Sequence, residues 1–575
     1  MPDNNRSDLR RIQVKRIQAL YEHFFRRFFD NDTLSTEGET ETTVVRALCT
    51  VAVPPLMAAF WLYPHYAQYP PRNIWAVASD RYFFVLYSFI VMGLVATVEW
   101  EMLFPDRADF QILLPLGLRE WEMFWAKGKA LLKFLGMFLI AANLFPTFFY
   151  AAASTPPRGP IWRNIGIHAV ASLASGTFAA FALLAIGGIA VCLIPPRWFR
   201  RVSTVVQTLT VTALVGMFLP FPFFGSHMQM LLSSSTGISR WLPPVWFLGL
   251  YERMIRGAAA TPAAGALTAT ALWALAISVA AAIAIYPLAW ARQRRRAMEG
   301  DGRAQPQRSR SLLRPVLHRL LRMPQQRAVF HFITQTITRS QRYQLYLAFY
   351  GGTGLALAAC CAFILRERGG ILGIGISNAG IRAVLPLLLF WIAMGLRTAF
   401  AFPVDMRARW IFPMSLKADR DTEQTHTARA GQLWLFFALL GVVVLFPFAL
   451  TAAGLWWWPV LLETACSLLV VVLLAAALFV GRTQIPFTRP RLPGRKALPV
   501  VMVTYAAIFP ALVLSTVQLE LAAERRAAIL GWAIAGAAAA LLILRALDLL
   551  ACKGIIGAFP EDEEEEGPLR LGLTR

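Results

Sequence analysis

The sequence predicts an all-α polytopic integral membrane protein with about 12 transmembrane helices in two pseudo-repeated six-helix halves. Of its 575 residues, 57% are hydrophobic and only 15% are charged, whereas soluble domains are ~45–50% apolar. The apolar residues fall in twelve long blocks, and a helix needs ~20 such residues to cross a bilayer. The basic residues are concentrated in alternate connecting segments. These three observations together favour a multi-pass helical protein.

The twelve predicted spans follow one another along the whole chain. They cover residues 44–63, 80–99, 126–150, 168–194, 202–222, 266–290, 343–365, 381–401, 432–454, 458–480, 498–517 and 527–550. Blocks of this length do not fit a transmembrane barrel, whose strands alternate over ~10 residues.

The net charge of +23 is distributed by topology. If the N-terminus is cytoplasmic, 42 of the 56 Lys and Arg residues fall in cytoplasmic segments and 12 in outer ones. This is the positive-inside bias of membrane proteins, so the charge does not indicate a nucleic-acid partner. It predicts a location in the cell (inner) membrane with both termini cytoplasmic.

Polar stretches divide the chain into four parts. We expect a first six-helix transmembrane half with an N-terminal interfacial helix over 1–291 and a basic cytoplasmic linker with a second interfacial helix over 292–342. A second six-helix half follows over 343–552, and an acidic cytoplasmic tail over 553–575. The linker contains the Gly-, Pro-, Gln- and Ser-rich stretch Gly300–Ser311, which is typical of flexible connections.

A repeat follows the second span of each half. Residues 104–118 and 402–416 both fit Phe-Pro-x8-(Leu/Phe)-Pro-(Leu/Met)-x-Leu. Two prolines ten residues apart suit a short helix bounded at both ends, because proline is tolerated in a first turn and disfavours helix in the residue before it. Each copy alone is compatible with an ordinary loop, but two copies at equivalent positions favour paired functional surfaces.

Two other features of the sequence are candidates for function. The segment Phe221–Arg256 is apolar but interrupted by Pro, Ser and Gly, which predicts short re-entrant or interfacial helices between the fifth and sixth spans. Few ionisable residues lie well inside spans, and such residues are by default functional candidates. For Arg397, Arg545 and Asp548, near predicted cytoplasmic ends, we expect snorkelling. For Glu463, near an outer end, we expect solvation or a local partner.

No catalytic motif is present in the sequence. The nearest fragment to a phosphate-binding loop, residues 127–130, lacks the upstream glycine and the hydroxyl that would contact magnesium. The Cys and His residues do not have metal-ligand spacing. We therefore expect a transporter subunit and not an enzyme, with no catalytic residues, metal site or cofactor on this chain.

The stretch from Asp109 to Lys127 contains Leu-Pro-Leu-Gly-Leu-Arg-Glu followed by Ala-Lys. It resembles the Leu-Pro-(Leu/Val)-x-x-Arg-Glu stretch of permease subunits of type-2 ATP-binding-cassette (ABC) exporters. That family has an interfacial helix before the first span, a coupling helix after the second, and re-entrant helices between the fifth and sixth. The second half resembles it by topology and by Phe402–Lys417, and departs after Lys417. Twelve spans then look like a fused pair of six-span permeases.

The resemblance implies that separate ABC ATPase subunits, in two copies, bind ATP and magnesium and drive alternating access. The other partners are membrane lipid and an unidentified exported substrate. The residues it places at the ATPase are Pro105, Asp106, Arg107, Asp109, Pro115, Arg119, Glu120 and Lys127 in the first half, and Pro403, Asp405, Arg407, Arg409, Pro413 and Lys417 in the second. Charge reversal of Arg107 and Asp109, or of Arg407 and Arg409, is expected to weaken ATPase binding and transport while leaving insertion and helix packing intact. An ion-coupled secondary transporter and a membrane-embedded transferase acting on lipid-linked substrates are the alternatives.

Overall fold

A computed structural model of the chain describes residues 16–29, 40–67, 72–100, 102–104, 107–156, 159–233, 237–299, 321, 324–368, 371–401, 420–452, 457–479, 486–487 and 498–552. The chain divides into two compact units. Unit 1 comprises Met1–Gln307 and Leu365–Gly375, and unit 2 comprises Arg308–Ile364 and Ile376–Arg575.

About 89% of the described residues are helical, and eleven helices among them are long and apolar enough to cross a membrane. The prediction of an all-α polytopic membrane protein is confirmed at this level. Six of the eleven lie in unit 1 and five in unit 2. The remaining predicted span, 498–517, falls in helix α19 (Leu498–Arg525), which is not among the eleven. The division into six and six stays a prediction.

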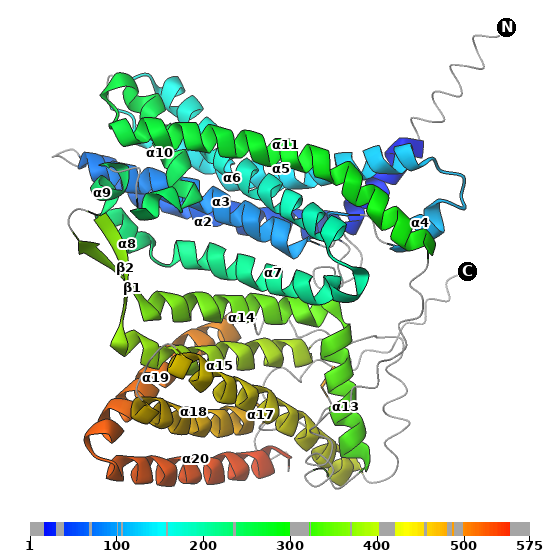
Figure 1. The fold of residues 1–575 in the computed structure, drawn as a ribbon, viewed down its shortest axis with the longest axis vertical. Coiled ribbons are helices and arrows are strands. Elements are labelled where there is room, and N and C mark those ends of the chain that lie inside the picture. The colour runs from blue at the N-terminus through cyan, green and yellow to red at the C-terminus, as the bar shows by residue number, and fades with distance from the viewer. Residues whose placement is uncertain are drawn as a thin grey trace. The chain divides into compact units, whose positions relative to one another are not determined.

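The described part of unit 1 contains six long helices and several short ones, which can be followed in Figure 1. The long helices are α2 (Thr40–Ala67), α3 (Ile74–Val98), α5 (Glu120–Ala153), α6 (Ile161–Leu193), α7 (Pro196–Phe218) and α11 (Pro262–Glu299). Residues 16–27 are also helical. Helix α11 continues eight residues into the predicted linker, which starts at 292.

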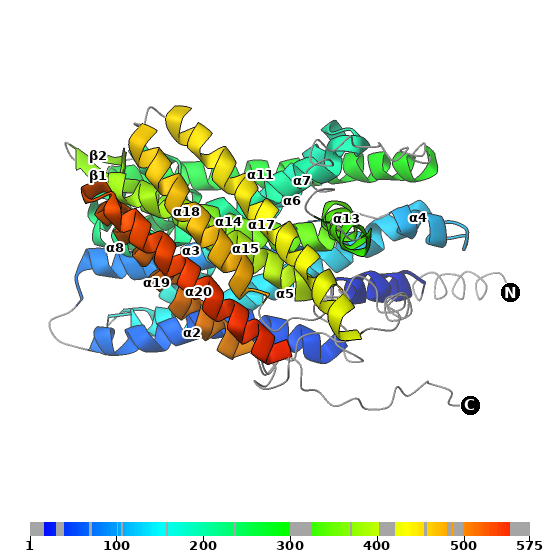
Figure 2. The ribbon, with the colours of Figure 1, turned by 90° about the horizontal axis from the view of Figure 1, so that it is seen from below.

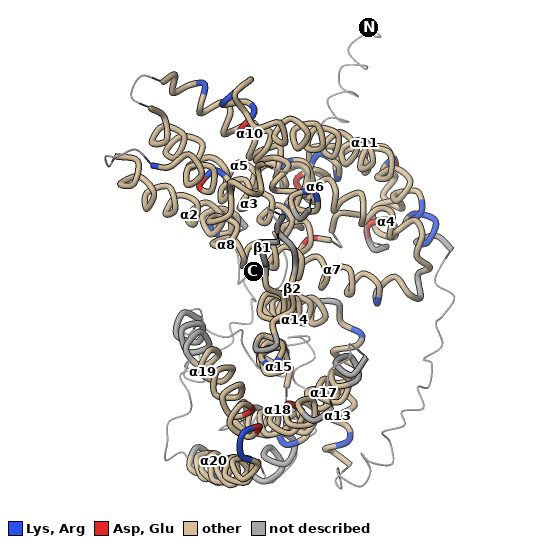
Figure 3. Tube along the Cα trace, turned by 60° about the vertical axis from the view of Figure 1, so that its left-hand side comes forward, with Lys and Arg blue, Asp and Glu red and all other residues tan. Residues whose placement is uncertain are grey.

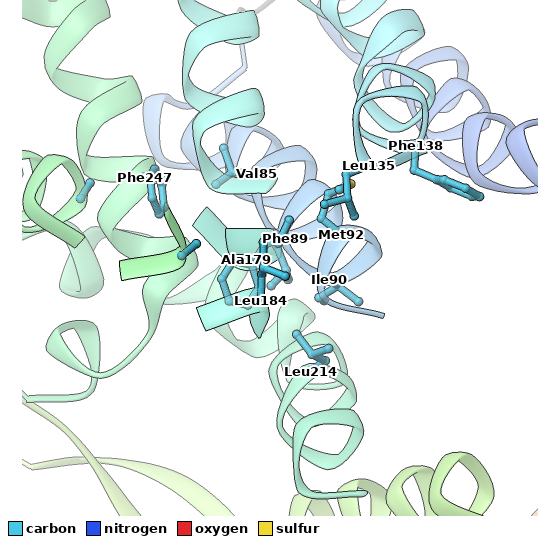
Figure 4. Close-up of a cluster of buried hydrophobic side chains, with 14 of the residues drawn as sticks. Val85, Phe89, Ile90, Met92, Leu135, Phe138, Ala179, Leu184, Leu214 and Phe247 are labelled. Atoms are coloured by element: carbon cyan, nitrogen blue, oxygen red, sulfur yellow. The ribbon is translucent and has the colours of Figure 1, made fainter. Parts of the chain in front are cut away.

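Helix α3 is the central helix of unit 1. In its most apolar stretch 72% of the residues are buried, compared with 17% in α2 and in α11. Figure 4 shows Phe89 and Met92 of α3 among side chains of α5, α6 and α7. Gly176 of α6 permits this packing, because a Cβ there would lie 2.6 Å from the Ser88 hydroxyl oxygen of α3. Small residues allow membrane helices to approach closely.

The segment between α7 and α11 folds into short helices, which confirms that part of the prediction for Phe221–Arg256. They are α8 (Phe221–Ser226), α9 (Met228–Ser233), η1 (Gly237–Arg240), α10 (Pro243–Arg256) and η2 (Gly257–Ala259). Prolines at the starts of α8 and α10 fit the first helical turn. Helix α10 packs against α3, α6 and α11. This packing brings the charged residues of α10, including Glu252, against the long helices of unit 1.

Unit 2 contains α13 (Pro324–Arg339), α14 (Gln341–Ala362), α15 (Asn378–Ala401), α17 (Arg420–Ala452), α18 (Trp457–Ala477), α19 and α20 (Ala528–Cys552). Its central helix is α15, with 67% of its most apolar stretch buried, whereas the value for α20 is 0%. Helix α20 lies beside α18 and α19 (Figure 2). Its apolar surface is therefore exposed and suited to lipid.

A two-stranded sheet follows α14 and was not predicted. It pairs β1 (Phe363–Arg368) with β2 (Ile371–Ile376). The predicted span 343–365 thus ends earlier, at Ala362. Three consecutive charged residues, Arg366 to Arg368, are costly in lipid, and the Gly369-Gly370 pair that follows them favours a tight turn. The backbone N–H of Ser377 donates to the carbonyl of Ala362 at 2.8 Å and closes the base of the sheet.

Candidate functional site

The predicted coupling segment of the first half contains a short helix, α4 (Arg107–Leu113), between α3 and α5. The turn after it ends at Gly117, whose φ of 75° is readily adopted only by glycine. The chain then enters α5, where the Arg119 backbone N–H donates to the Glu122 carboxylate at 3.2 Å. A helix therefore forms between the two prolines, as the repeat predicts. Pro105 and Asp106 lie outside the described residues, and Pro115 is exposed in the turn.

Two of the predicted coupling residues meet inside the protein. Asp109 and Lys127 are each 3% exposed. The Lys127 ammonium donates to the Asp109 carboxylate at 3.1 Å and to the carbonyl of Phe104 at 3.0 Å. Arg27, from the N-terminal helical segment, pairs with the other oxygen of Asp109. These charges therefore anchor α4 to the bundle and do not lie on its surface. Reversing Asp109 would disturb packing, contrary to the expectation from sequence.

The other side of the coupling segment is exposed and apolar. The exposed fractions are 63% for Ile112, 70% for Leu116 and 67% for Trp121. We call these three residues the apolar knob. Arg119 is also exposed, and Glu120 forms an ion pair with Arg294 of α11.

The coupling segment predicted in the second half lies outside the described residues. This applies to Pro403, Asp405, Arg407, Arg409, Pro413 and Lys417. The described chain stops at the end of α15, Ala401, and resumes at Arg420, the first residue of α17.

A buried ion-pair network lies at the other end of α3. Figure 3 shows long uncharged stretches along the helices of unit 1, with charged positions gathered toward their ends. The Arg81 guanidinium donates to the Glu252 carboxylate of α10 at 2.7 Å, and Arg256 contacts the second oxygen of Glu252 at 2.9 Å. Arg81 also lies over the ring of Tyr251, 5.2 Å from its centroid. One carboxylate thus has two cationic partners.

The negative charge of Asp80, the neighbour of Arg81, is also compensated by partners inside the protein. It is 6% exposed and accepts hydrogen bonds from the Tyr66 hydroxyl at 2.7 Å and from Arg72 at 2.9 Å. The network ties the end of α2, the start of α3 and α10 together. We call the five charged residues Arg72, Asp80, Arg81, Glu252 and Arg256 the unit 1 charge cluster.

Unit 2 has a corresponding group near the starts of α15 and α18 and the end of α19. Arg382 donates to Glu524 at 3.0 Å and also interacts electrostatically with Glu520 and Glu463. Glu463 is 4% exposed and Glu520 is 1% exposed. We call these four residues the unit 2 charge cluster. Here three carboxylates share one arginine.

The sequence reasoning missed most of these residues because of where it placed the span boundaries. The second span was expected to begin at residue 80, which left Asp80 and Arg81 at its edge, whereas α3 begins at Ile74. Glu252 and Glu520 were assigned to outer connections. The two adjacent charges at 80 and 81, directly before an uncharged apolar run, were the available signal. Of the ionisable groups that were singled out, Glu463 belongs to a charge cluster.

Among the described residues, no three His, Cys, Asp or Glu side chains are grouped so that they could hold a metal ion. Comparisons with known proteins found no match to this chain among family models, curated proteins or solved structures.

Proposed function

We propose that this chain is the membrane-spanning permease component of an ATP-driven exporter whose ATPase is a separate polypeptide. The observation that carries the proposal is the coupling segment. Its short helix α4 lies between two long apolar helices and is held by buried ion pairs. The exposed apolar knob consists of Ile112 of α4, Leu116 of the following turn and Trp121 at the start of α5. Exposed apolar groups on such a segment are what a partner protein covers.

The anchoring of α4 would let it transmit force. Asp109 connects it to α5 through Lys127 and to the N-terminal helical segment through Arg27. Phe110 packs against Trp290 of α11, with ring centroids 5.6 Å apart. Because protein interiors are close-packed and resist compression, a push on α4 would move α5 and α11 with it. This is the linkage that alternating access requires.

The remaining parts of the proposal follow from this assignment. Two ATPase subunits would bind ATP and magnesium, one against each half, and the export of an unidentified substrate would follow their closure. The chain would lie in the cell inner membrane with the apolar knob and both termini in the cytoplasm. Support for this orientation comes from the distribution of Lys and Arg along the sequence.

The test is to replace the apolar knob. The double variant Ile112→Ser/Leu116→Ser removes exposed side chains that contribute little to folding, since surface substitutions usually change stability by about 0.5 kcal/mol or less. We expect it to insert and fold normally but to lose co-purification of an ATPase that contains a phosphate-binding Gly-x-x-x-x-Gly-Lys loop. The readout is crosslinking in native membranes, affinity purification and identification of the captured ATPase by mass spectrometry.

The matched control is Leu193→Ser, at the end of α6, where the leucine is 75% exposed. It should retain the ATPase. Equal capture by wild type, double variant and control would remove the coupling assignment. Absence of any such ATPase from the wild-type sample would favour the ion-coupled transporter.

A further inference from the structure

The unit 2 charge cluster carries an excess of negative charge in a buried place. Its one arginine, Arg382, already forms an ion pair with Glu524, and these two side chains are 21% and 31% exposed. Glu463 and Glu520 lie deeper and interact electrostatically with each other. Two ionised carboxylates in a low-dielectric interior are strongly unfavourable unless a positive charge joins them. Arg382 can compensate only part of this charge.

Each of the two buried carboxylates also has an oxygen that is not hydrogen-bonded. One oxygen of Glu463 and one of Glu520 are buried without a partner among the residues that the structure describes. Leaving a buried charged acceptor unsatisfied costs more than its hydrogen bond is worth. The two oxygens are therefore available to a ligand.

Ser467 supplies an independent observation. It is fully buried, and its hydroxyl oxygen has no hydrogen-bond partner in the described part of the chain. Helical Ser and Thr commonly donate to the carbonyl one turn earlier, as Thr516 of α19 does to Leu512 at 2.7 Å. Ser467 does not, although it lies one turn after Glu463 on the same face of α18. Its hydroxyl is thus free for the same ligand.

We propose that Glu463, Ser467 and Glu520 form a binding site for one monovalent cation, either Na⁺ or a proton. All the available donors are oxygen atoms, which suit hard cations. Ca²⁺ usually takes about six to eight oxygen ligands, which is more than two carboxylates and one hydroxyl offer. Glu463 lies six residues after the start of α18, or about 9 Å along the helix, which places the site near this end of α18.

The site goes beyond the proposed function, because an ATP-driven permease does not need a bound cation. It can therefore be tested on the purified full-length chain without an ATPase. The thermal unfolding midpoint would be measured in detergent at pH 8 while NaCl replaces choline chloride at constant ionic strength. A second series in choline chloride would lower the pH from 8 to 5. A ligand that binds only the folded state raises the midpoint in a saturable way.

We expect the wild type to be stabilised by Na⁺ or by protons, and Glu463→Gln and Glu520→Gln each to lose that response. The neutral glutamines remove the uncompensated charge, so both variants should fold in choline at pH 8. Glu22→Gln, an exposed position on the N-terminal helical segment, is the control and should respond as wild type does.

The variant Ser467→Ala distinguishes a Na⁺ site from a proton site. It removes a neutral ligand, so it should raise the half-saturating Na⁺ concentration roughly 3- to 10-fold, as expected for one lost hydrogen-bond-sized interaction, while leaving a proton response unchanged. The proposal is overturned if wild type, Glu463→Gln and Glu520→Gln respond equally to Na⁺ and equally to pH, or if the wild type responds to neither.

Discussion

The two units place charge at the same point of their central helices but compensate it differently. Arg81 of α3 precedes Met92 by eleven residues, and Arg382 of α15 precedes Met394 by twelve, each methionine beginning a Met-Gly-Leu sequence. In unit 1 three arginines neutralise two carboxylates, and the Arg81–Glu252 pair is buried. In unit 2 the ion pair is the more exposed part, and the unpaired carboxylates are buried.

The difference teaches that a buried charge can have two roles in one architecture. A carboxylate such as Asp80, whose two oxygens accept from an arginine and a tyrosine hydroxyl, fixes helices relative to each other. A buried carboxylate such as Glu520, which has an oxygen without a hydrogen-bond partner among the described residues, is the kind to which we assign ligand binding.

The largest expected effect breaks the unit 1 charge cluster. Arg81→Met leaves Glu252 with Arg256 alone, and removing one partner of a buried ion pair typically costs about 3–5 kcal/mol. Arg382→Met removes a half-exposed pair and should cost about 1 kcal/mol or less. Thermal unfolding of the purified variants measures both. Equal losses of stability in the two variants would show that Arg81 and Arg382 contribute equally to the stability of the fold.

A second prediction concerns the other compensated carboxylate of unit 1. Lys127→Met should destabilise the protein by roughly 2–4 kcal/mol, because Asp109 would stay buried with a weaker set of partners. Adding Asp109→Asn should recover part of the loss, which a double-mutant cycle would quantify. Lys129→Met, two residues along α5 and exposed, is the control. If Lys129→Met lost as much stability as Lys127→Met, the loss would come from a general effect on α5 and not from the Asp109–Lys127 ion pair.

A third prediction, measured as a pH dependence, asks whether an uncompensated carboxylate in unit 1 behaves like those of unit 2. Glu99, directly after α3, is 4% exposed and has a carboxylate oxygen without a partner among the described residues. Burial raises the pKa of this carboxyl to about 8. The folded state then holds a proton that the unfolded state releases above its ordinary pKa, so stability should fall as pH rises between about 4.5 and 8.

The variant Glu99→Gln should lose this slope, which is at most about 1.4 kcal/mol per pH unit. Its thermal midpoint relative to wild type should therefore be higher at pH 8 than at pH 5. If the difference between the two thermal midpoints were the same at pH 5 and pH 8, the charge of the Glu99 carboxylate would be compensated by a partner in solution.

Much of the fold could be read from the sequence because it depends on composition and period. Long apolar blocks determine helices in lipid, since every backbone polar group must be bonded within its own segment. Prolines and glycines predicted the short helices between α7 and α11 and the length of the α4 segment. The end of α14 at Ala362 was missed, because the apolar block continues three residues past the helix before the charges at 366–368 begin.

The candidate sites could not be predicted in the same way, because they depend on contacts between residues that are far apart in the sequence. The sequence by itself determined a charge at residues 80, 109, 127 and 252, and it placed the coupling segment after the second span. Only the tertiary structure decided that Asp109 and Lys127 face inward and Ile112 and Leu116 outward, and that Glu252, 171 residues after Arg81, is its partner. The physical reason is that compensation of a buried charge depends on distances between helices far apart in the chain, whereas insertion into a membrane depends on each helix alone.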